Sequence, residues 1–109
     1  MIYTVIVTVS AKAEADAAYQ WLHERTRQYS AKWFNGLLDA LQGLDHLPNR
    51  CAIAPESRHF DEKIHQLLYG KRPHVYRVLF VTRQTIVYIL HIRHGARLEM
   101  KADEIQLPQ

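Results

Sequence analysis

The predicted fold depends mainly on residues 69–97, which read YGKRPHVYRVLFVTRQTIVYILHIRHGAR. Two runs within this stretch, 75–82 and 86–94, are rich in β-branched and aromatic residues, and only residues 83–85 separate them. This composition is typical of strands at the centre of a sheet. We therefore predict a β-hairpin here and expect the other elements to pack around it.

The same part of the chain carries an excess of positive charge. From Lys63 to Leu98 there is no Asp or Glu, and seven Lys or Arg side chains contribute +7. The remainder holds seven cations and all eleven acids, −4, which gives the chain its net charge of +3. A cationic face on a small domain attracts phosphate groups or an acidic partner.

A strand and two helices are predicted ahead of this region. Residues 2–9 are β-branched and indicate a first strand. Ser10 is expected to cap a helix over 11–29, and Ser30 a second helix that ends at Pro48. The aromatic residues of these helices are interpreted as packing residues rather than as base-stacking residues; they are Trp21, Trp33 and Phe34.

The remaining segments complete a single domain over residues 1–109. Residues 49–62 show no clear period and are expected to be a loop, 64–69 a short strand, and 98–109 a frayed helix or a disordered tail. We predict an α+β fold: an antiparallel-rich sheet of about four strands, in the order strand–helix–helix–strand–strand–strand. The helical hairpin would cover one face of the sheet and leave the other face open.

Cysteine content and hydropathy suggest a compartment. The single cysteine, Cys51, has no internal partner for a disulfide, and no apolar run approaches the ~18 residues of a membrane span. We expect a cytoplasmic protein with no membrane partner.

Several segments resemble the RelE/ParE superfamily, the small toxins of bacterial type II toxin–antitoxin pairs. The resemblance covers about positions 2–97 and is most specific at 67–71 (LLYGK), 76–80 (YRVLF) and 89–97 (ILHIRHGAR). It implies a cognate antitoxin that wraps the toxin in a hetero-oligomeric complex.

The branches of this superfamily imply different activities. RelE-like members are endoribonucleases that cut messenger RNA on the ribosome, and this is our first hypothesis. ParE-like members inhibit DNA gyrase without known nuclease chemistry, and this is the alternative; a basic adaptor without toxicity is a third class. Several ribonuclease members carry a catalytic tyrosine after the last strand, whereas no tyrosine follows Tyr88 here.

The resemblance to the ribonuclease branch implies a catalytic set of Arg77, His94 and Arg97. RNA cleavage needs a base, an acid and cations that stabilise the phosphorane. The two arginines would hold the scissile phosphate, and His94 would transfer a proton near neutral pH. Alternatively, Arg77 pairs with a buried acid, and His94 serves partner docking in the gyrase branch.

Further cations are expected to contact RNA or a protein partner. Arg93, Lys71 and Arg72 would bind ribosomal and message backbone or an antitoxin's acids, although the last two are equally consistent with a solvated turn. Glu56 is a candidate general base or a salt-bridge residue. We expect no metal, because His91 and His94 are three residues apart on a strand and so point to opposite faces. We expect no other cofactor either.

Overall fold

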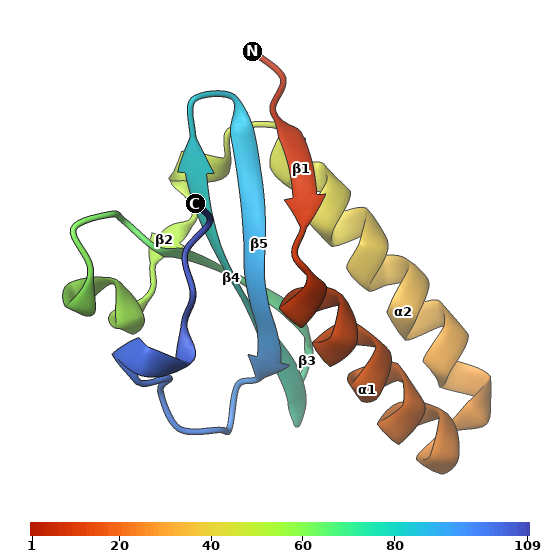
Figure 1. Ribbon diagram of the computed structural model, residues 1–109. Helices are drawn as coiled ribbons and strands as arrows, with labels where there is room; N and C mark the ends of the chain where they lie inside the picture. Colours follow the sequence, from red (N-terminus) through yellow and green to blue (C-terminus); the bar gives the residue numbers. More distant parts are fainter.

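The computed structural model describes all residues, 1–109, and shows two helices packed on a mixed five-stranded sheet (Figure 1). The sheet order is β1-β5-β4-β3-β2, in which β1 runs parallel to β5 and every other pair is antiparallel. The elements are β1 (Thr4–Val7), α1 (Val9–Arg25), α2 (Arg27–Gln42), β2 (Ala52–Ile53), β3 (His65–Lys71), β4 (His74–Arg83) and β5 (Ile86–His94). The predicted α+β class is confirmed. The fifth strand is β2, two residues of the predicted loop that pair with the edge of β3.

The helix caps differ from the prediction. The Thr8 hydroxyl, rather than that of Ser10, accepts the Ala11 N–H at 3.3 Å, so α1 begins two residues earlier than expected. The break between the helices falls at Thr26, and Ser30 lies buried inside α2. Its hydroxyl donates to a main-chain carbonyl one turn earlier, which hydroxyls inside helices commonly do.

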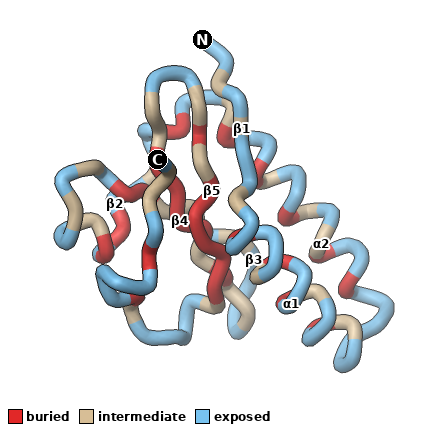
Figure 2. Tube along the Cα trace, viewed as in Figure 1, coloured by how far each residue is buried: buried red, intermediate tan, exposed pale blue.

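The helices bury small and aliphatic residues against one face of the sheet. Figure 2 shows buried residues running along β4 and β5, with the exposed residues of both helices turned outward. Small and aliphatic residues at helical spacing in the sequence predict one buried face for α1, and the structure confirms it: the face consists of Ala11, Ala15, Ala18 and Leu22. No helix combines the length and the apolar character needed to cross a membrane.

The opposite face of the sheet is covered, contrary to the prediction that it is open. A second core contains Leu79, Val81 and Leu90 from the sheet, and Met100 and Ile105 from the C-terminal segment. Met100 and Ile105 are 4% and 6% exposed, so residues 98–109 differ from the frayed or disordered tail expected. Removing the apolar side chains on this face of β4 and β5 from water lowers the free energy of the folded chain, which explains why the C-terminal segment packs over them.

A β-bulge in the middle of β5 changes the direction of the side chains that follow it. Leu79 pairs with His91 and Phe80 with Ile89, so Leu90 is the extra residue. Val87 and Ile89 face the helices before the bulge, and Ile92 does so after it. His94, two residues further on, consequently lies on the helix side of the sheet.

Two glycines permit close approaches at the β3 edge. Gly70 has φ +104°, and a side chain there would meet the His74 carbonyl. Gly36 on α2 leaves room for the Tyr69 hydroxyl, which donates to the Trp33 carbonyl at 2.7 Å. The Tyr69 contacts fix the end of β3 against α2, and the Gly70 contact lies within the β3–β4 hairpin.

Candidate functional site

Arg77 is held in a buried ion pair. Its Nη1 donates to Glu56 Oε2 at 3.0 Å, its Nη2 donates to Glu56 Oε1, and its Nε donates to Gln66 Oε1 at 3.0 Å. The Arg77 side chain is 12% exposed and the Glu56 side chain is fully buried. Both edges of the guanidinium are therefore occupied, and Arg77 forms the pair with a buried acid that was the alternative to a phosphate contact.

Glu56 is a structural anchor rather than a free base. Its Oε2 also accepts the Met100 main-chain N–H at 3.0 Å, so one carboxylate joins the turn Pro55–His59, strand β4 and the C-terminal segment. Burial alone would raise the pKa of Glu56. The hydrogen bonds from Arg77 and the main chain outweigh burial and lower this pKa below its usual value. Of the two sequence hypotheses for Glu56, the salt bridge is confirmed.

The predicted catalytic set is divided by the sheet. Arg77 lies on the face covered by residues 54–60, while the His94 ring packs against Tyr76 on the helix side, with ring centroids 5.2 Å apart. The His94 Nδ1 accepts the Ala96 N–H at 3.0 Å, so the neutral ring carries its proton on Nε2. Arg77 and His94 therefore cannot act together on one phosphate in this arrangement.

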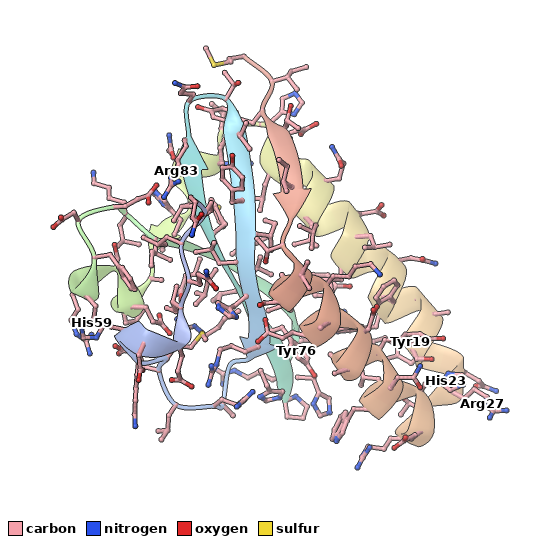
Figure 3. All side chains as sticks on the ribbon, in the orientation of Figure 1. Tyr19, His23, Arg27, His59, Tyr76 and Arg83 are labelled. Carbon is pink, nitrogen blue, oxygen red and sulfur yellow. The ribbon has the colours of Figure 1, made fainter.

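A groove of about 670 Å³ lies between α1 and the ends of β4 and β5. In Figure 3, Tyr76 lies where these strand ends approach α1. Four rings line the groove in the spatial order Trp21, His74, His94 and Tyr76, with centroids 5.4, 5.8 and 5.2 Å apart from one neighbour to the next. Burial raises the pKa of the Tyr76 phenol, so this ring stays neutral at physiological pH.

The groove also gathers three of the predicted site residues. Arg93, His94 and Arg97 line it together; Arg93 is 8% exposed, His94 is half-buried and Arg97 is exposed. Glu14 is the acid in the lining, and it already accepts from the Ile92 N–H and the His91 ring. The groove thus combines an apolar, aromatic wall with a cationic end.

Lys71 and Arg72 lie next to the groove rather than in it. Both are exposed at the end of the β3–β4 hairpin and form no ion pair, and the following Pro73 belongs to the groove lining. Lys71 is the last residue of β3, so the turn is shorter than predicted. A partner seated in the groove can reach both side chains.

Sequence reasoning missed two side chains of the groove. Trp21 was interpreted as a packing residue, yet it is 40% exposed, with the Arg25 guanidinium 4.0 Å from its ring. His74 begins β4 and contacts the Trp21 ring. The signal that the sequence offers is an aromatic ring close in sequence to cations. Only the packing of α1 against the sheet shows that Trp21 and His74 meet.

Neither a protein-family model nor a curated protein sequence matches the chain. Among solved structures, a chain described as "Chromosomal ParDE TA system from P. aeruginosa" matches with a TM-score of 0.68 and 17% sequence identity. The match covers 85% of this chain and 96% of that one. The chain therefore has the fold of a ParDE-system protein, in agreement with the fold that the RelE/ParE resemblance implied.

Proposed function

We propose that this protein is the toxin of a type II toxin–antitoxin pair and that it acts by docking onto a protein, as a ParE-like inhibitor of DNA gyrase, rather than by cutting RNA. The observation that carries the proposal is the closed Arg77–Glu56 pair. The likeness to a ParDE-system chain supports the same branch through the fold.

The placement of Arg77 and His94 counts against the three-residue nuclease set of the first hypothesis. Cleavage by a 2′-hydroxyl requires a cation on the phosphate and proton-transfer groups on either side of it. Arg77 has no free edge for a phosphate, and His94 lies on the other face of the sheet. No tyrosine follows Tyr88 to replace them.

The groove suits the docking of a protein segment. Apolar and aromatic walls provide the area that desolvates on binding, and cations at the rim provide orientation and selectivity. Arg97 at the groove, with Lys71 and Arg72 beside it, would pair with the acids of an antitoxin segment. The same surface would be unavailable to the target while the antitoxin is bound.

A ribosome-dependent endoribonuclease is the second candidate function. The feature that favours it is the gathering of Arg93, His94 and Arg97 at one end of the groove. In that case His94 would transfer the proton and Arg97 would hold the phosphate, without Arg77.

Controlled expression in bacterial cells separates the two candidates. We expect DNA breaks and filamentous cells while translation continues, and loss of supercoiling by purified gyrase when the purified protein is added. Primer extension should find messages intact. Messages cut within codons, with gyrase unaffected, would contradict the proposal and favour the ribonuclease.

A further inference from the structure

Strand β1 leaves one side of its main chain without a partner in the sheet. The sheet order places β1 at an edge, with β5 as its only neighbouring strand. The Thr4 and Thr8 N–H groups donate to carbonyls of the β5 side at 2.8 and 3.1 Å. Because the main-chain groups of a strand point to alternate sides, the N–H and C=O groups of Val5 and Val7 point away from β5. Neither residue has a main-chain hydrogen bond to a turn or loop.

The outer edge of β1 is accessible along most of its length. In Figure 1 the arrow of β1 lies at the front of the view with nothing drawn over it, and Figure 2 shows this strand as mostly exposed. The 3-10 turn Gly43–Asp45 meets the beginning of the edge, where the Asp45 carbonyl accepts the Tyr3 N–H at 2.9 Å. The edge from Val5 to Val7 is therefore open to another strand.

The same segment is apolar and carries no charged side chain. The first charged side chain in the sequence is that of Lys12. Five of the twelve exposed large apolar residues lie within the first nine positions; they are Met1, Ile2, Ile6, Val7 and Val9. Natural proteins usually protect a free edge with charged side chains, with proline or with a very short strand. The opposite edge follows this rule, since β2 is two residues long, whereas β1 has neither charge nor proline.

The sequence of this edge reads the same in both directions. Residues 4–8 are Thr-Val-Ile-Val-Thr, centred on Ile6. When two copies meet antiparallel about a two-fold axis at Ile6, Val5 of each copy lies opposite Val7 of the other. Each of these pairs exchanges both of its outward hydrogen bonds, and Ile6 meets its own copy across the axis. Every cross-strand pair then joins β-branched side chains, which pack well in sheets.

We propose that β1 is a self-association edge at which two copies of this chain pair antiparallel through residues 4–8 and join their sheets into one. The chains each carry a net charge of +3 and repel one another, so an uncharged edge is where two copies meet at the least electrostatic cost. No residue of β1 lines the groove between α1 and the strand ends. The proposal therefore holds whether the protein inhibits gyrase or cuts RNA.

Analytical ultracentrifugation of the purified full chain tests the proposal. The edge is shorter than a standard interface, which buries roughly 1,200–2,000 Å², so the dimer should depend on concentration. The average mass should rise from the 12.8 kDa of one chain towards twice that value as the protein concentration rises to about 1 mM. A mass that stays at that of one chain throughout would overturn the proposal and leave the edge to an extended strand of a different protein.

Two variants at the edge distinguish strand pairing from other contacts. Ile6→Lys, at a 41% exposed position, places two positive charges opposite each other across the axis and should keep the mass at that of one chain. Val7→Pro removes an outward N–H, which proline tolerates at a sheet edge, and should weaken the dimer roughly ten-fold or more. Circular dichroism checks that each variant keeps the wild-type fold. A dimer that survives in folded Ile6→Lys would place the contact elsewhere and contradict the proposal.

A control and a rescue test the position of the axis. Ile53→Lys adds the same charge to β2 at the opposite edge, where the side chain is 50% exposed, and should leave association unchanged. Equal loss of the dimer in Ile6→Lys and Ile53→Lys would show only general charge repulsion. Mixing the Ile6→Lys chain with an Ile6→Glu chain places opposite charges face to face and should restore the dimer. A mixture that stays monomeric would refute the two-fold axis at Ile6.

Discussion

Replacing Glu56 with glutamine should destabilise the protein far more than a surface change of the same kind. The carboxylate accepts two hydrogen bonds from Arg77 and one from the Met100 N–H, and it is fully buried. Glutamine keeps one acceptor oxygen, but its NH₂ group replaces the other oxygen and faces the donors of the site. The Arg77 guanidinium is then left without its charge partner. Breaking a buried pair from one side costs about 3–5 kcal/mol, a large share of a typical stability of about 5–15 kcal/mol.

The chain provides a matched control for this measurement. Glu62 forms the same two-bond pair with Arg83, with both distances 2.8 Å, but the Arg83 side chain is 36% exposed and the Glu62 side chain 25%. Glu62→Gln should therefore cost no more than about 1 kcal/mol. Urea unfolding of both variants at pH 7, followed by circular dichroism, gives the two free energies of unfolding. If Glu56→Gln costs no more than Glu62→Gln, the Arg77–Glu56 pair does not hold the C-terminal segment as described.

Three further predictions concern the packing of the fold and its pH dependence. Gly36→Ala places a methyl group against the Tyr69 hydroxyl and should cost about 1–3 kcal/mol in urea unfolding, with a changed aromatic circular dichroism signal; an unchanged spectrum would contradict the contact. Met100→Ala should cost about 2–5 kcal/mol, whereas Leu98→Ala at an 87% exposed position should cost less than about 0.5 kcal/mol; equal losses would mean that the tail does not pack. The folded-state pKa of Glu56 is lowered, so its contribution to stability is complete above the unfolded pKa of about 4.3 and is lost as the pH falls through the folded value. As the pH is lowered, the free energy of unfolding should accordingly fall less steeply in Glu56→Gln than in the wild type. Identical slopes would refute the assignment of this pH dependence to Glu56.

The regular elements were predictable because their patterns are local. A run rich in apolar, β-branched and aromatic residues placed β5 at 86–94, the bounds that the structure shows. Helical spacing of small residues identified the buried face of α1. Caps were less predictable, because Thr8 and Ser10 are both good capping residues and only the chain's entry into α1 distinguishes them.

The site was harder to predict because its decisive contacts are distant in sequence. Arg77 and Glu56 are 21 residues apart, and Glu56 lies in a segment that shows no periodic pattern. The bulge at Leu90 turns His94 to the helix side. The sequence does not show where one strand carries an extra residue relative to its partner, so this change of face could not be predicted. The cationic character of residues 63–98 was visible, but the neutralisation of Arg77 by Glu56 depends on tertiary packing.

The most direct test of the proposed function is growth arrest by the double variant Arg77→Met with Glu56→Gln. This pair of changes removes both buried charges and keeps an acceptor for the Met100 N–H, so the fold should survive better than in either single variant. Urea unfolding of the purified double variant establishes that it is folded. If Arg77 is structural, the folded double variant should arrest growth and inhibit gyrase as the wild type does. A folded double variant that no longer arrests growth, while the wild type does, would show that the Arg77 guanidinium takes part in the activity and would contradict the docking mechanism.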